Sequence, residues 1–169
     1  MGAPNQQMAQ ATFSQTDSLS LFNRRVTPIV SAAATLTVAQ SGSICLLNAA
    51  AGILYTLPVI TAADVGVRFR FIQTVTITGG AAKVITGAAS SFLLGSVFTA
   101  IEATTPGANP GPKDFVFNGS THVAISMNGT TSGGVIGTDF EVIALSATQW
   151  FIQGYVKASG TIETPAATS

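Results

Sequence analysis

The residues that most often carry chemistry are scarce in this chain and lie far apart. There is one histidine, His122, one cysteine, Cys45, and seven Asp or Glu residues. A zinc or similar metal site needs clustered His, Cys or carboxylate ligands, and no such spacing occurs. His122 could join a Ser-His-Asp arrangement, because triads assemble in space, but no Gly-x-Ser-x-Gly elbow is present. We therefore expect no enzyme, no metal and no cofactor.

The remaining chemical candidates also have structural explanations. Cys45 lies in the apolar run 44–47, which predicts a small buried hydrophobic residue rather than a nucleophile or ligand. His122 is expected to be a strand side chain at the surface. Gly79-Gly80 and Gly133-Gly134 lack the Gly-x-Gly-x-x-Gly and Gly-Lys-Ser/Thr patterns of phosphate-binding loops. We expect both glycine pairs to be hairpin tips.

The composition is unusual for its low charge. Only 8% of the 169 residues are Asp, Glu, Lys or Arg, the formal net charge is zero, and 47% are hydrophobic. Typical soluble domains carry about 25% charged residues. Because net charge keeps proteins apart in solution, this surface indicates a chain that works in an assembly, which we favour, or one coated with Thr and Ser.

Charge and hydropathy patterns also argue against several partners. The seven basic residues are scattered, and only Arg24 and Arg25 are adjacent, so the basic face that nucleic acid requires is not predicted. No uninterrupted apolar run of about 18 residues occurs, so we expect no membrane span. The first residues show no secretory signal, and the single cysteine fits synthesis in a reducing cytoplasm or indifference to the redox state of the compartment.

Three segments are predicted. Residues 1–26 are rich in Gln, Ser, Ala, Asn and Thr and form an extended N-terminal arm, residues 27–157 form a β-domain, and residues 158–169 form a short C-terminal tail. The arm is either a passive leader or a segment that orders on a partner. In the second case, apolar side chains would enter grooves and the arginines would meet carboxylates. These candidate partner-binding residues are Phe13, Leu19, Phe22, Arg24 and Arg25.

Between the ends, apolar and polar residues alternate with the period of two that is typical of strands, and Gly or Pro separates the runs. The longest hairpin is expected from 139–145 and 149–156, and a second around Asn118-Gly119, a pair that favours a type I′ turn between 115–117 and 122–126. The fold class is all-β, a single antiparallel β-sandwich or jelly-roll-like domain. Further strands are expected at 35–38, 53–57 before Pro58, 68–78 with a bulge near Gln73, 83–86, and 92–101.

One succession of segments resembles a known group of proteins. It runs Thr-Leu-Thr-Val-Ala-Gln-Ser-Gly at 35–42, Leu-Leu-Asn-Ala-Ala-Ala-Gly at 46–52, Thr-Leu-Pro at 56–58 and Gly-Val-Arg-Phe-Arg-Phe at 66–71. The strand pair in 87–101 and the terminal hairpin with Trp-Phe-Ile-Gln-Gly at 150–154 continue it. This order, in a charge-poor chain rich in Thr, Ala and Gly, resembles the β-domains of head-decoration and fibre proteins of tailed bacteriophages.

The resemblance implies a viral structural protein located in the virion. It would be a homotrimeric capsid decoration protein, or cement protein, that sits at local three-fold positions and clamps neighbouring subunits of the major capsid protein. The alternative is a receptor-binding (adhesin) module of a phage fibre or tail, whose loops grip a host glycan or protein. The long loops 104–112 and 129–138 contain no aromatic residue, which favours decoration.

Overall fold

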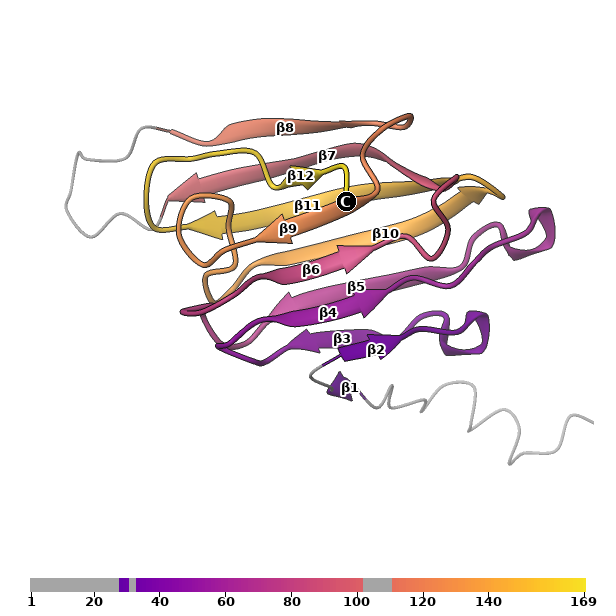
Figure 1. The fold of residues 1–169 in the computed structure, drawn as a ribbon, viewed down its shortest axis with the longest axis horizontal. Helices are drawn as coiled ribbons and strands as arrows, with labels where there is room; N and C mark the ends of the chain where they lie inside the picture. The colour runs from indigo at the N-terminus through magenta and orange to yellow at the C-terminus, as the bar shows by residue number, and fades with distance from the viewer. Residues whose placement is uncertain (1–27, 31–32, 102–110) are drawn as a thin grey trace, which may run out of the picture.

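The computed structural model describes residues 28–30, 33–101 and 111–169, and nearly all of its regular structure is strand. Figure 1 looks through two sheets along the shortest axis of the molecule, so the strands of one sheet lie over those of the other. The all-β prediction is therefore confirmed. The large sheet has the order β1 (Ile29–Val30), β3 (Ile44–Leu47), β5 (Arg68–Gln73), β10 (Asp139–Ser146), β11 (Gln149–Ala158), β7 (Phe92–Ile101), β8 (Lys113–Asn118).

The small sheet has the order β12 (Ala166–Ala167), β9 (Ala124–Met127), β6 (Ala82–Ile85), β4 (Ile53–Thr56), β2 (Ala33–Thr35). Two short 3-10 turns, η1 (Val38–Gln40) and η2 (Ala62–Asp64), lie in the connections. The predicted strand at 35–38 is therefore only partly right, because η1 replaces its second half.

One hydrophobic core joins the inner faces of both sheets. Tyr55 of the small sheet meets Phe71 of the large sheet edge to face at 5.6 Å, and Phe71 stacks on Phe140 at 5.2 Å. The Tyr55 hydroxyl lies 3.2 Å from the carbonyl oxygen of Leu46, to which it can donate a hydrogen bond across the layers. Alternation of apolar and polar residues explains this arrangement, because alternate side chains of a strand point to the same face.

The chain changes sheet after every strand from β1 to β6. As a result β1, β3 and β5 run parallel in the large sheet, and β2, β4 and β6 run parallel in the small sheet. Five of the ten strand pairs between described residues are parallel. The expectation of antiparallel pairing is wrong for these five. In four of them a single visit to the other layer brings the chain back in the same direction, and the fifth joins β7 to β11, which lie far apart in the chain.

The hairpin predicted at Asn118-Gly119 is wrong. β8 pairs with β7 in the large sheet, whereas β9 pairs with β6 and β12 in the small sheet. Gly119 has φ of 71°, but no described residue other than glycine has a positive φ, so Asn118 does not adopt the type I′ geometry. Its side-chain oxygen instead accepts hydrogen bonds from the backbone N–H groups of Ser120 at 3.0 Å and Thr121 at 2.9 Å.

The second Asn-Gly pair works in the same way. The side-chain oxygen of Asn128 accepts hydrogen bonds from the N–H groups of Thr130 at 2.9 Å and Ser132 at 3.1 Å. Gly79-Gly80 and Gly133-Gly134 also lie in connections between opposite sheets, so the prediction that they are hairpin tips is wrong. In this fold Asn and Gly mark passages between layers.

We expect Asn118→Ala to lower the free energy of unfolding by about 1–2 kcal/mol, because two turn N–H groups lose their acceptor. Asn118→Asp is the matched control, since its carboxylate keeps an oxygen in the same place and should retain most of the stability. Urea denaturation followed by tryptophan fluorescence measures both. Equal losses in the two variants would show that the acceptor does not hold this turn.

Several strand predictions are confirmed. β7 spans Phe92–Ile101, β10 and β11 form the predicted long hairpin, and β4 ends at Thr56, shortly before Pro58. The run 68–78 is shorter than expected, because β5 ends at Gln73, where a bulge was predicted. The Gln73 side-chain amide donates to the carbonyl of Val75, and the chain leaves the sheet there.

Of the two predicted end segments, the structure describes only the C-terminal one. In the segment predicted as a tail, β12 pairs with β9, Ile162 and Pro165 are buried, and the Lys83 ammonium donates to the carbonyl of Ser169 at 2.8 Å. The C-terminal segment is therefore part of the small sheet. The arm predicted at residues 1–26 lies outside the described residues, and it stays a prediction.

Candidate functional site

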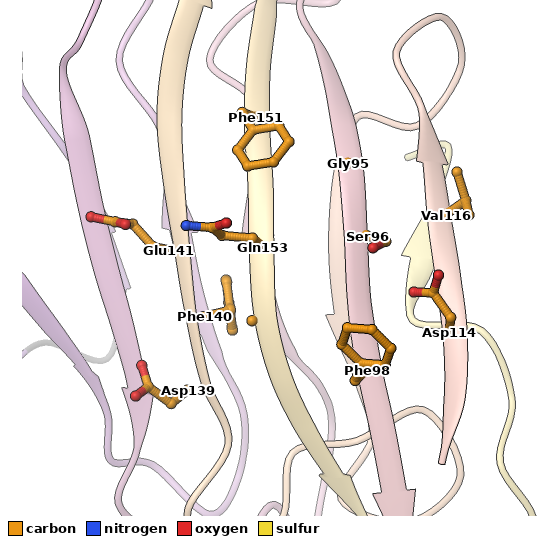
Figure 2. A pocket seen from close by; sticks show the side chains of 11 residues that line it. Gly95, Ser96, Phe98, Asp114, Val116, Asp139, Phe140, Glu141, Phe151 and Gln153 are labelled. Atoms are coloured by element: carbon orange, nitrogen blue, oxygen red, sulfur yellow. The ribbon is translucent and has the colours of Figure 1, made fainter.

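A shallow groove of about 670 Å³ crosses the outer face of the large sheet over β10, β11, β7 and β8. Figure 2 shows Asp139 and Glu141 on one side of it, Asp114 and Val116 on the other, and Phe98 and Phe151 between them. Ser96 and Gln153 supply further polar groups. The groove therefore combines an apolar centre with carboxylates on both sides.

The floor of the groove is backbone at Gly95 in β7 and Gly154 in β11. A Cβ on Gly95 would lie 2.1 Å from the carbonyl oxygen of Ile152, and one on Gly154 would lie 2.5 Å from that of Asp139. Glycine within a strand often marks such close approach of two backbones. These two residues fix the depth of the groove, because no larger residue fits there.

Strand register places most of the groove's outward-facing side chains, with their neighbours on the same face, in two adjacent rows. Through successive strand pairs one row reads Ile72, Asp139, Tyr155, Phe98, Asp114, and the next reads Arg70, Glu141, Gln153, Ser96, Val116. Phe98 is 55% exposed, Val116 64% and Tyr155 41%. Large apolar side chains thus point to solvent on β11, β7 and the edge strand β8, in a sheet whose other face is already buried in the core.

The outer face of the small sheet differs in character. The register and burial of its strands show that its larger apolar side chains are Leu54 and Ile85. Its other outward side chains are small or polar, namely Ala33, Thr35, Thr56, Lys83, Ser126 and Ala167. The outer face of the large sheet is therefore the stronger candidate for an interaction surface.

Charge is concentrated at the groove. Three of the five carboxylates among the described residues line it, namely Asp114, Asp139 and Glu141. The Arg70 Nε donates to an oxygen of Asp139 at 2.8 Å, and this hydrogen bond, with the nearby charge of Asp139, raises the pKa of Arg70. Within the described ranges this is the one ion pair, so Asp114 and Glu141 have no ion-pair partner there. The groove therefore keeps capacity for a cation.

None of the predicted partner-binding residues can be placed. Phe13, Leu19, Phe22, Arg24 and Arg25 all lie outside the described residues, so their role stays a prediction. The groove itself was not predicted. Two features of the sequence would have indicated it: the glycines inside the strand patterns at 95 and 154, and the apolar residues on both faces of 139–145.

His122 lies in the turn after β8 and is half-buried, so the prediction of a surface strand position is wrong. Its Nδ1 accepts a hydrogen bond from the N–H of Asn118 at 3.1 Å, and its ring meets Phe117 edge to face at 5.8 Å. These contacts give His122 a structural role in the passage from the large sheet to the small one.

Cys45 is fully buried in β3, as the sequence predicts. Burial raises the pKa of its thiol from 9.0 to about 12, because the thiolate is poorly solvated in the core. The nucleophilic form is therefore suppressed at neutral pH.

We expect Cys45 to react with a thiol reagent at pH 8 roughly a thousand-fold more slowly in the native protein than in urea, as a pKa difference of about three units implies. The unfolded chain releases its thiol proton near pH 9 and the native chain near pH 12. Stability should therefore fall between these values, at up to about 1.4 kcal/mol per pH unit. Rapid native labelling would contradict the burial of this residue.

Within residues 28–30, 33–101 and 111–169, no three His, Cys, Asp or Glu side chains come together as a metal site. In the same ranges, no helix is long and apolar enough to cross a bilayer.

Comparison with known proteins gives no relative. No protein-family model, no curated protein and no solved structure matches the chain.

Proposed function

We propose that this chain is a viral structural protein, a capsid decoration or cement protein on the head of a tailed bacteriophage. Its partners would be the major capsid protein and further copies of itself in a homotrimer, and it would be made in the host cytoplasm and work in the virion. The observation that carries the proposal is the group of exposed apolar side chains, Phe98, Tyr155 and Val116, on the outer face of the large sheet. The expected fold of such a protein is a jelly-roll-like sandwich, and the two sheets that share one core support this proposal.

The physical argument starts from exposure. Phe98, Tyr155 and Val116 stand in neighbouring strands and are 55%, 41% and 64% exposed. A contiguous exposed apolar patch on a soluble protein usually marks an interaction surface. Aromatic residues are enriched among those that carry interface energy.

The test is binding to phage heads that lack the protein, measured by co-sedimentation. We expect the native chain to bind saturably and Phe98→Asp with Val116→Asp to weaken binding at least ten-fold, because two apolar contacts are replaced by charges. Leu54→Asp is the matched control, since Leu54 is 43% exposed on the outer face of the small sheet. Failure of the native chain to bind any such head, or equal loss in the control, would reject the proposal.

The adhesin alternative also has an observation in its favour. Phe98 lies beside Asp114 in register, and Gln153 lines the same groove. An aromatic face beside carboxylate and amide groups suits a glycan, which offers apolar ring faces and hydroxyls. Binding to host cells or surface glycans, lost in Phe98→Ala and absent toward heads, would favour this function over decoration.

A further inference from the structure

We propose that the groove on the large sheet binds residues 19–25 of a second copy of this chain. The inference rests on the self-association in the proposed function and assigns its site. The groove is described above, and the segment precedes the first described strand, β1.

The groove requires a ligand with two properties. Phe98, Phe151 and Val116 need apolar side chains against them, and the carboxylates at both sides need cations. Glu141 and Asp114 have no ion-pair partner within the described residues, so a basic ligand gains charge-assisted hydrogen bonds without displacing Arg70 from Asp139.

Residues 19–25 of this chain have both properties. Their sequence is Leu-Ser-Leu-Phe-Asn-Arg-Arg, so three large apolar residues come just before the one adjacent pair of basic residues in the protein, with Asn23 between them. An extended segment of seven residues spans roughly 23 Å, and the four strands under the groove span about 14 Å at their usual spacing. The segment can therefore cross the groove. Because Asp114 on β8 and Glu141 on β10 flank it, Arg24 and Arg25 meet a carboxylate in either direction.

Geometry favours the segment of a neighbour over the chain's own segment. β1 is an edge strand, three strand spacings from β10, which is about 14 Å. Three residues lie between Arg25 and Ile29, and the four residue steps that join them reach only about 14 Å when fully extended. The chain's own Arg25 could therefore reach Glu141 only with these residues fully stretched straight across the strands, with no slack for docking. A second copy imposes no such limit.

This exchange also closes naturally. Each copy donates one segment and offers one groove, so three copies can pass their segments head to tail around a closed ring. A trimer formed in this way would cover the apolar face of every copy.

The test is disulfide crosslinking of the full chain that carries Phe22→Cys and Phe98→Cys. Cys45 is buried and its thiol is unreactive, so only the introduced thiols should react. On a non-reducing gel we expect covalent oligomers up to the trimer, at least ten-fold more abundant than in Phe22→Cys with Leu54→Cys. Arg24→Glu with Arg25→Glu should reduce crosslinking at least five-fold, and adding Asp114→Lys with Glu141→Lys should restore it.

Each other outcome rejects the inference. A crosslink within one chain would place the segment on its own groove. A trimer in sedimentation with no crosslink would leave self-association intact and put its interface elsewhere. A monomer in sedimentation would remove both the inference and the homotrimer, while binding of that monomer to phage heads would still support decoration.

Discussion

Gly154→Ala is expected to lower the free energy of unfolding by about 4 kcal/mol, a large part of the 5–15 kcal/mol that typically holds a domain together. Gly154 has φ of 152°, where a residue with a Cβ is strained by roughly 1–3 kcal/mol. The new Cβ would also lie 2.5 Å from both the Asp139 carbonyl oxygen and the Phe140 Cα. Backbone atoms in a central strand cannot give way cheaply, so overpacking adds about 1–3 kcal/mol.

Substitutions at two other glycines distinguish backbone strain from overpacking. Gly42 has φ of 85°, and a Cβ there would have no other atom within 4 Å, so Gly42→Ala should show the strain alone, about 1 kcal/mol. At Gly160 a Cβ would make an ordinary 3.7 Å contact with Thr131, and Gly160→Ala should change stability little. Urea denaturation of the three variants measures this order. If Gly154→Ala and Gly42→Ala lost the same amount, close strand approach at the groove floor would be disproved.

The second large effect is expected at Trp150. It is fully buried and lies 6.3 Å from Phe69, ring centre to ring centre. Trp150→Ala would leave a cavity in the core and should cost about 3–5 kcal/mol. Circular dichroism during thermal and urea unfolding provides the measurement, because the variant loses the only tryptophan.

Trp150→Phe is the informative companion. The indole Nε1 of Trp150 has no hydrogen-bond partner among the described residues, and burying a donor without a partner costs about 1–3 kcal/mol. Removing that donor offsets part of the lost packing, so Trp150→Phe should cost much less than Trp150→Ala. Val116→Ala, at a residue that is 64% exposed, is the control and should stay near the native value. A loss in Trp150→Phe as large as in Trp150→Ala would contradict this account.

The sequence predicts local pairings well and distant ones poorly. β10 and β11 were predicted as a hairpin because a short turn joins two long alternating runs, and adjacent runs with such a turn pair with each other. The Asn118-Gly119 pair gave an equally clear turn signal, yet the strand after it joins the other sheet. A turn signal states that the chain bends and carries no information on which strand comes next to it.

The groove escaped prediction for a related reason. Both parities of β11 carry large apolar or aromatic residues, with Trp150 and Ile152 inward and Phe151 and Tyr155 outward. Period-two alternation identifies the core face only when the other face is polar. In a chain with so few charges that contrast is missing, so exposure of Phe98 and Tyr155 emerges only once the partner strands are known.

The position of β10 and β11 has a consequence for synthesis. They occupy the middle of the large sheet, between β5 and β7, although they come from the last third of the chain. Until β10 and β11 leave the ribosome, the large sheet is divided into two parts, β1-β3-β5 and β7-β8. The edge strands β5 and β7 then have no hydrogen-bonding partner on their inner sides. We expect the domain to fold only after nearly the whole chain is made, slowly, as proteins with distant strand pairings do. While the chain waits, its exposed edges would make it a client of host chaperones.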